Sequence, residues 1–150
     1  MKHPRQFPFW AIAIVVMLLV NTAPRSFAQD RMSDKDIQSL MKNLQQDSKK
    51  FQSKFNSDIQ KSPIRNTSEE KDSKTLVKRF TDQTHGMLNQ FKQTKNADQA
   101  LPVVLDSAGK IDKLLATTPM NDATKDAWAR VKDELNTLSK QFNIKFQIGQ

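Results

Sequence analysis

Residues 127–142 read AWARVKDELNTLSKQF, and their apolar side chains recur every three to four positions. On a helical wheel, one narrow stripe holds Ala127, Trp128, Val131, Leu135, Leu138 and Phe142, and the other side holds Asp126, Arg130, Asp133, Asn136, Ser139 and Lys140. This pattern is typical of a helix that packs one face against a core. The stretch carries no catalytic motif, so it predicts structure and not chemistry.

Three earlier segments show the same periodicity. The first runs from residue 34 to about 61, and its stripe is Ile37, Leu40, Met41, Leu44, Phe51, Phe55 and Ile59. The second covers 68–94, with Leu76, Val77, Phe80, Thr84, Met87, Leu88 and Phe91. The third covers about 98–117, with Leu101, Val104, Leu105, Ala108, Ile111 and Leu115. The fourth helix is expected from about 121 to 142.

The ends of these segments carry recognisable start and stop signals. The runs 33-SDKD-36 and 67-TSEE-70 resemble capping boxes, in which a hydroxyl oxygen accepts a hydrogen bond from a backbone amide. Their acidic residues also suit the positive N-terminal end of the helix dipole. Ser62–Pro63 should end the first helix, and Asp98 should open the third, where Pro102 is tolerated in the first turn. The run 117-TTP-119 ends the third helix and offers a candidate cap for the next one.

Four amphipathic segments with short connections predict one architecture. It is an all-α, antiparallel up-down-up-down four-helix bundle, which follows an N-terminal signal peptide and ends in a short extended tail. The tail, residues 143–148, alternates apolar and polar side chains as a strand does. A single strand is not stable alone, so we expect a tail packed over the bundle end. An edge offered to a partner for strand addition remains the alternative.

Three positions within the stripes call for specific neighbours. Ser48 interrupts the first stripe, so that layer should pack loosely or be crossed by a larger side chain. Asp112 lies at the edge of the third stripe and needs a basic or hydrogen-bonding partner if it is covered. Trp128 is expected to anchor the core.

The N-terminal region has the features of a signal peptide. Lys2 and Arg5 precede the apolar run 9-FWAIAIVVMLLV-20, and 26-SFA-28 places small residues before an expected cleavage at Gln29. A retained membrane anchor is the alternative, but the run is shorter than the roughly 20 residues that span a bilayer. We therefore assign residues 1–28 to a cleaved signal peptide and 29–150 to a single domain, exported to the periplasm or beyond.

Composition narrows the possible partners. The chain contains no cysteine, so no disulfide framework exists and the domain relies on packing. Removing Lys2, Arg5 and Arg25 leaves 21 basic and 16 acidic residues, a net charge of +5 with the two signs interspersed. This favours a solvated surface with a mild preference for anionic partners. The aromatic residues sit at core spacing, which argues against a nucleic-acid interface.

The search for chemistry yields no site. His85 is the only histidine after residue 28, and it should lie at the boundary of its helix or exposed. No second histidine and no cysteine can join it as a metal ligand, and a haem held by His85 with Met41 or Met87 is disfavoured because these methionines suit the core. The carboxylates Glu69 and Glu70 are explained by the helix dipole. We predict no catalytic, cofactor-binding or metal-binding residue, no cofactor, and no enzyme activity.

A resemblance supports the same view. The run 127-AWARVKDELNTL-138 with 142-FNI-144, and the spacing of Phe51, Phe55 and 62-SP-63, resemble small exported bacterial helical-bundle proteins of unknown function. The resemblance implies a helical bundle and export, and it implies no activity.

The sequence therefore predicts a non-enzymatic protein with a binding or structural role in the bacterial cell envelope. Its partner would be an envelope protein or an anionic surface, with no nucleic acid and no transmembrane segment in the mature chain. We expect a monomer or a weak homo-oligomer. The alternative is a lipid or small-hydrophobe carrier, or a periplasmic chaperone-like protein for unfolded clients. The lysine-rich face of the first helix, with Lys42, Lys49, Lys50 and Lys54, is the closest match to a membrane-binding surface.

Overall fold

The computed structural model describes residues 31–145, and this part of the chain is entirely helical apart from its connections. Its elements are α1 (Asp34–Ile59), α2 (Ser68–Thr94), α3 (Ala100–Thr117) and α4 (Asp122–Gln141). The expected signal peptide, residues 1–28, and the tail beyond residue 145 lie outside the described residues. Within residues 31–145, no helix combines the length and the apolar character that crossing a membrane requires.

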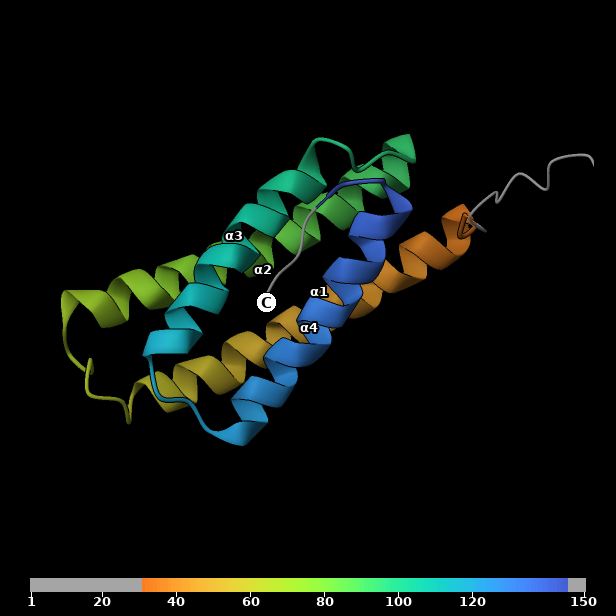
Figure 1. Cartoon of the computed structure of the whole chain (residues 1–150). Helices are drawn as coiled ribbons and strands as arrows, with labels where there is room; N and C mark the ends of the chain where they lie inside the picture. The colour runs from red at the N-terminus through yellow and green to blue at the C-terminus, as the bar shows by residue number, and fades with distance from the viewer. Residues whose placement is uncertain (1–30, 146–150) are drawn as a thin grey trace, which may run out of the picture.

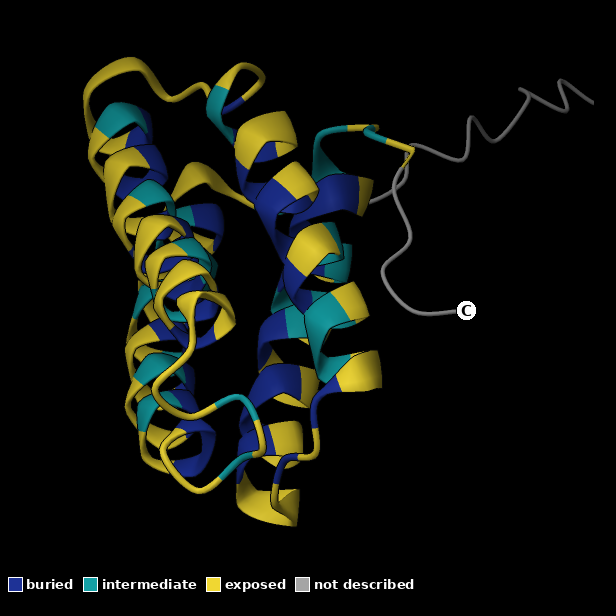
Figure 2. Ribbon diagram, turned by 90° about the vertical axis from the view of Figure 1, so that its left-hand side faces the viewer, coloured by how far each residue is buried: buried dark blue, intermediate teal, exposed yellow. Residues whose placement is uncertain are grey.

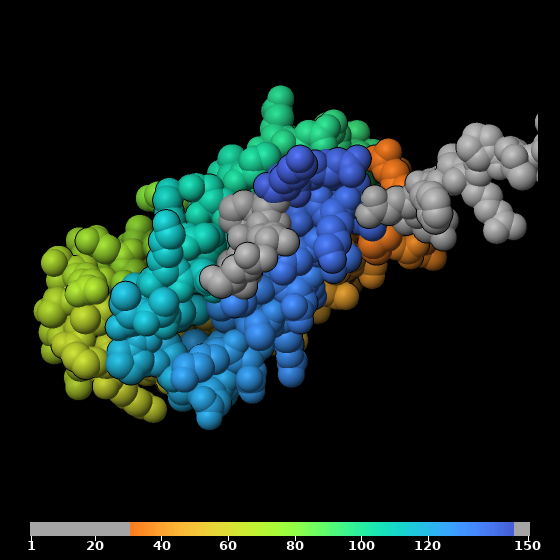
Figure 3. All heavy atoms as spheres, in the orientation of Figure 1, coloured from red at the N-terminus to blue at the C-terminus, as the bar shows by residue number. Residues whose placement is uncertain are grey.

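The four helices pack around one core. α1 lies between α2 and α4 and packs closely against both, α3 packs against α2, and α3 and α4 touch least (Figure 1). The main chain at Met32 donates to the side chain of Gln141, so the start of α1 lies beside the end of α4 (Figure 3). Asp58 bonds Asn121, so the end of α1 lies beside the start of α4.

The apolar stripes face inward, as the periodicity predicts. Dark blue buried positions line the inner faces of the helices in Figure 2, and yellow exposed positions cover the outside. The four stripes are buried except for their half-buried members, which are Leu40, Leu76, Leu115 and Phe142. Aromatic rings fill the centre: the Trp128 ring is tilted against Phe51, with ring centroids 4.8 Å apart, and meets Phe80 edge-on at 5.6 Å.

The hydroxyl bond of each predicted capping box is present, but within residues 31–145 neither acid accepts the return bond from the amide of its cap residue. Ser33 accepts a hydrogen bond from the amide of Asp36 at 3.2 Å, and Thr67 accepts one from the amide of Glu70 at 3.3 Å. The Glu70 carboxylate reaches the amide of Asn66 at 2.6 Å, one residue before the cap itself. These bonds satisfy amides that have no partner within the helix.

The other helix ends differ in part from the expectation. α3 begins at Ala100 and not at Asp98, and its cap position, Gln99, makes no side-chain bond. The residue that caps α4 is Asn121, which accepts from the amide of Thr124 at 2.8 Å, so the run 117–119 does not cap it. The apolar pattern does not reveal such differences because it shows which face of a helix is buried and not which residue begins or caps the helix.

The segment 143–148, whose alternating side chains are typical of a strand, does not begin in an extended conformation. Asn143 has a φ of 52°, and its amide donates to the carbonyl of Lys140 at 3.2 Å. The amide of Ile144 donates to the carbonyl of Ser139 at 2.8 Å, and Ile144 packs against the core. These bonds form a Schellman motif, so Asn143 and Ile144 terminate α4. Residues 146–148 lie outside the described residues.

Candidate functional site

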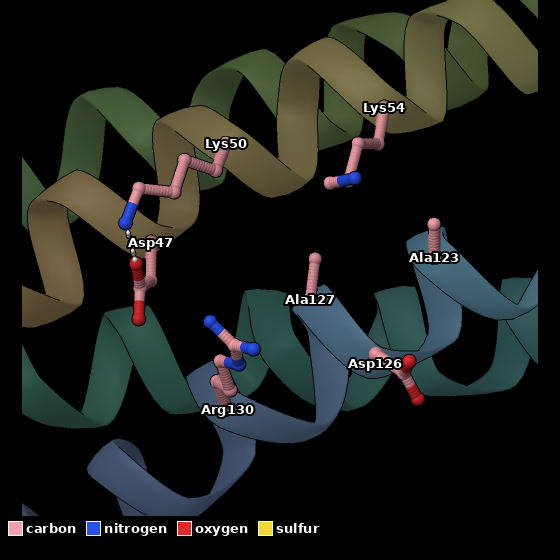
Figure 4. A pocket seen from close by; sticks show the side chains of 7 residues that line it. All are labelled: Asp47, Lys50, Lys54, Ala123, Asp126, Ala127 and Arg130. Carbon is pink, nitrogen blue, oxygen red and sulfur yellow. Dashed lines mark hydrogen bonds and ion pairs between the residues drawn. The ribbon is translucent and has the colours of Figure 1, made fainter.

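One concave feature of the described surface is a groove between α1 and α4. It has a volume of about 240 Å³ and is lined by Asp47, Lys50, Lys54, Ala123, Asp126, Ala127 and Arg130. Figure 4 shows Lys54 extending from α1 toward α4 and Arg130 extending from α4 toward α1, on either side of Ala127. Charged side chains and two alanines, from two helices, therefore line the groove.

The sequence builds this groove by placing small residues opposite long ones. Ala123 and Ala127 lie one turn apart on α4, and their methyl groups leave space beside α1. Lys50 and Lys54 lie one turn apart on α1 and line this space; Lys54 extends toward α4, whereas Lys50 runs along α1 to Asp47 (Figure 4). The periodicity that predicts the helices does not predict the groove, because it depends on which faces of α1 and α4 meet.

The charges in the groove are unequally paired. Lys50 lies 2.7 Å from Asp47 and forms a salt bridge with it. Within residues 31–145, neither Lys54 nor Arg130 forms a salt bridge. Asp126 is exposed, and its carboxylate points away from α1 in Figure 4. Two cations from different helices, Lys54 and Arg130, thus line one cavity without forming a salt bridge, while Asp47 and Asp126 supply negative charge to the same lining.

A half-buried carboxyl group on α4 lies near Asp47. Glu134 lies one turn beyond Arg130, and its Oε2 atom is buried without a hydrogen-bond partner among the described residues. Burial, together with the charges of Asp47 and Asp133, raises the pKa of Glu134 from 4.5 to about 7, while Lys50 opposes the shift. This carboxyl group therefore titrates near neutral pH.

Asp112 has the partners that its position calls for. The indole Nε1 of Trp128 donates to Asp112 Oδ1 at 2.9 Å, and Lys132 lies 3.2 Å from the same oxygen. Asp112 belongs to α3, and both partners belong to α4. The cluster therefore joins two neighbouring helices that have few other close contacts.

A second polar cluster, centred on Asp58, was not predicted from the sequence. Asp58, which is 8% exposed, accepts from the amide of Asn121 at 3.0 Å and from its side chain at 2.6 Å. The hydroxyl of Thr124 donates to Asp58 at 2.8 Å. One carboxylate thus ties the end of α1 to the first turn of α4. The only sequence signal is an acid on the apolar side of α1, next to Ile59 in the chain.

The residues considered for haem binding do not form a site. His85 is exposed and contacts two amide side chains, those of Gln45 on α1 and Asn89 on α2. Met41 and Met87 are buried in the core. Within residues 31–145, no three histidine, aspartate or glutamate side chains are grouped so that they could hold a metal ion.

Two further depressions are lined largely by lysines. One contains Lys71, Lys74 and Lys78 of α2, where Lys74 pairs with Glu70 and Lys78 pairs with Asp82. The bond from Lys74, followed by that from the Asn66 amide, lowers the pKa of Glu70. The other depression is lined by Asp34, Lys35, Gln38, Ser39, Lys42 and Lys95.

The chain was compared with three sets of known proteins. Neither the protein-family models, nor the curated proteins, nor the solved structures gave a match.

Proposed function

We propose that this protein is an exported, non-enzymatic binding protein of the bacterial cell envelope that recognises a polar, anionic partner through its surface. A cleaved signal peptide at residues 1–28 precedes one domain, 29–150, which acts as a monomer or a weak homo-oligomer. The resemblance of residues 127–138 and 142–144 to small exported bacterial proteins supports this setting.

An antiparallel up-down-up-down bundle is part of the proposal. The connections 60–67, 95–99 and 118–121 are short, which favours packing of consecutive helices side by side in opposite directions. The pairing of Met32 with Gln141 and of Asp58 with Asn121 supports opposite directions for α1 and α4. In Figure 1 the ribbon also turns back at each connection.

The observation that carries the functional proposal is the contrast between a closed core and a charged groove. Among residues 31–145, Val103, at 51%, is the one large hydrophobic residue that is exposed. Surfaces that hold unfolded clients or lipids expose larger apolar patches. The concave features, in contrast, are lined by charged side chains, most of them lysines. A polar partner suits this surface better than an apolar one.

The alternative function is binding of a lipid, a small hydrophobe or an unfolded client. Such a carrier would need an internal pocket, for which the layer around Ser48 and Ala108 is the expected place. Both residues are fully buried, and Ser48 satisfies its hydroxyl on the carbonyl of Leu44 at 2.6 Å. A pocket there would have to open on binding, so this observation supports the alternative less than the main proposal.

Binding of the apolar dye ANS separates the two functions. We expect the folded protein at neutral pH to give little dye fluorescence, because the four stripes cover one another. Strong dye fluorescence with an intact near-UV signal from Trp128 would reject the polar-partner proposal and favour an apolar ligand. Cell fractionation and N-terminal sequencing test the location, for which we expect an exported protein that begins at Gln29.

A further inference from the structure

Lys54 and Arg130 line the α1–α4 groove from facing helices and form no salt bridge within residues 31–145, although Asp47 and Asp126 also line the groove. Lys54 extends from α1 toward α4 and Arg130 extends from α4 toward α1, so an anion in the groove would lie between cations from both helices. Lys50 adds a third cation at the same rim, where its charge is shared with Asp47. This arrangement is what a bound anion would stabilise.

We propose that the α1–α4 groove binds a phosphate group, which Lys54 and Arg130 hold directly and Lys50 supports. This inference deepens the proposed function, because it names the anionic chemistry that the binding surface recognises. Arg130 would present its guanidinium as a two-pronged donor, and Lys54 would supply a mobile point charge from the opposite helix.

Phosphate suits the groove better than a carboxylate. A phosphate monoester carries close to two negative charges at neutral pH, which matches two cations that lack partners. Its oxygens point in several directions and can accept from both helices at once, whereas a carboxylate presents its two oxygens in one plane. The volume of about 240 Å³ leaves room for this group and for bridging water.

The other lysine-lined depressions are weaker candidates. At the α2 surface, Lys74 and Lys78 already pair with Glu70 and Asp82, and all of the lining lysines lie on one helix. The depression beside Lys35, Lys42 and Lys95 lacks an arginine. Only the α1–α4 groove, among the three, places an arginine and an unpaired lysine on facing helices.

The phosphate can belong to a soluble phosphorylated molecule or to a phospholipid headgroup. Both present the same oxygens to Lys54 and Arg130, so the groove alone does not separate them. A free phosphate would enter the groove on its own, whereas a headgroup would bring a membrane surface against the exposed sides of α1 and α4. The experiment therefore has one arm for each source.

The first arm titrates the isotope-labelled purified protein with inorganic phosphate, with ionic strength held constant by chloride. We expect saturable amide chemical shifts at Lys54, Ala123, Ala127 and Arg130. In the double variant Lys54→Gln/Arg130→Gln, affinity should fall by at least about tenfold. The double variant Lys49→Gln/Lys113→Gln is the matched control, because it removes the same charge from exposed positions outside the groove.

A second pair of variants tests the place directly. Ala123 is exposed in the first turn of α4, where an acid suits the helix dipole, so Ala123→Glu should fold and should block phosphate. Ala129→Glu adds the same charge to an exposed position of α4 that does not line the groove, and it should bind normally. Each groove variant is compared with its control. If a groove variant and its control lose phosphate affinity equally, phosphate is attracted by the overall charge of the protein and the groove is not the site.

The second arm measures co-sedimentation with vesicles of phosphatidylcholine that contain phosphatidic acid, against phosphatidylcholine alone. Sedimentation that is lost in Lys54→Gln/Arg130→Gln but kept in the control assigns the headgroup as the source. Saturable phosphate shifts without sedimentation assign a soluble phosphate. If neither probe binds, the site is rejected. That result leaves the ANS and fractionation tests of the proposed function unaffected.

Discussion

At the scale of single residues, Trp128 both packs in the aromatic core and donates a hydrogen bond. Its ring packs against Phe51 and Phe80, and its Nε1 donates to Asp112. The side chain is 3% exposed. A buried indole is most stable when its one donor has an acceptor, and Asp112 supplies it. Trp128 therefore links the aromatic centre of the core to the polar contact between α3 and α4.

Replacing Trp128 tests this dual role. Trp128→Ala should lower the free energy of unfolding by about 3–5 kcal/mol, because it leaves a large cavity and removes the donor to Asp112. Trp128→Phe should lose less, since it keeps most of the ring and loses the hydrogen bond. Urea denaturation followed by far-UV circular dichroism measures both. A loss below about 1 kcal/mol for Trp128→Ala would contradict a core role.

Glu134 makes stability depend on pH. Its folded pKa of about 7 lies above its ordinary value of 4.5, so the native state binds more protons than the unfolded state between these values. Stability contributed by this group is therefore present at low pH and is lost as pH rises through about 7. Burial is the main cause, and Asp47 and Asp133 add to it.

Glu134→Gln should remove this dependence. At pH 8 the variant should be more stable than the parent by about 1–2 kcal/mol, after allowance for partial exposure of the carboxyl group. At pH 4 the two proteins should be closer in stability, because the carboxyl group is protonated in both the native and the unfolded state. Urea denaturation at the two pH values gives the comparison. If the parent instead became more stable relative to Glu134→Gln as the pH rises, the predicted direction of the pH dependence would be wrong.

At the scale of secondary-structure elements, the Asp58 cluster joins α1 to α4. Its carboxylate accepts three hydrogen bonds, two from Asn121 and one from Thr124. The acceptor lies at the N-terminal end of α4, where a negative charge also suits the helix dipole. The cluster fixes the position of one helix end relative to another.

Removal of the Asp58 carboxylate should remove the hydrogen bonds that join the end of α1 to the start of α4. Asp58→Ala should lower the free energy of unfolding by about 2–3 kcal/mol, because it removes the acceptor of the buried Thr124 hydroxyl and of two donors on Asn121. Asp82→Ala is the control, since Asp82 forms an exposed salt bridge with Lys78 and should cost less than about 1 kcal/mol. Equal losses in the two variants would show that the cluster has no special role.

Gly86 weakens the middle of α2. It lies on the exposed side of the helix, and a methyl group built there meets no atom within 4 Å. Gly86→Ala should therefore raise the free energy of unfolding by about 0.5–1 kcal/mol through a better helix propensity. A thermal melt would show the change as a higher midpoint. An unchanged or lower midpoint would indicate a role for Gly86 that packing does not reveal.

At the scale of the whole molecule, one core connects all four helices. The aromatic cluster draws on α1, α2 and α4, and Asp112 ties α3 to α4. We expect one cooperative unfolding transition in which Trp128 fluorescence and far-UV circular dichroism coincide, provided that residues 1–28, which contain Trp10, are removed. Separate transitions for the two signals would show that some helices unfold independently.

The sequence predicted the helices well because burial and periodicity act locally. The stripe positions, the capping hydroxyls of α1 and α2, and the partner requirement of Asp112 all follow from residues within a few turns of one another. Ser139 is an exception, because it was assigned to the polar face of α4 and is buried, with its hydroxyl bonded to the carbonyl of Asn136 at 2.9 Å. A small hydroxyl that satisfies itself on its own helix can be covered at little cost.

The candidate site could not be predicted in this way. Lys54 on α1 lies far in the chain from Ala127 and Arg130 on α4, and each residue is ordinary on its own helix. The same holds for the contact of Asp58 with Asn121 and for the burial of Glu134 near Asp47. By itself the sequence determined which residues form each helix and which face is apolar, since these depend on neighbours one turn away. Only the tertiary structure decided which polar faces meet, because that depends on how the packed helices are rotated about their axes.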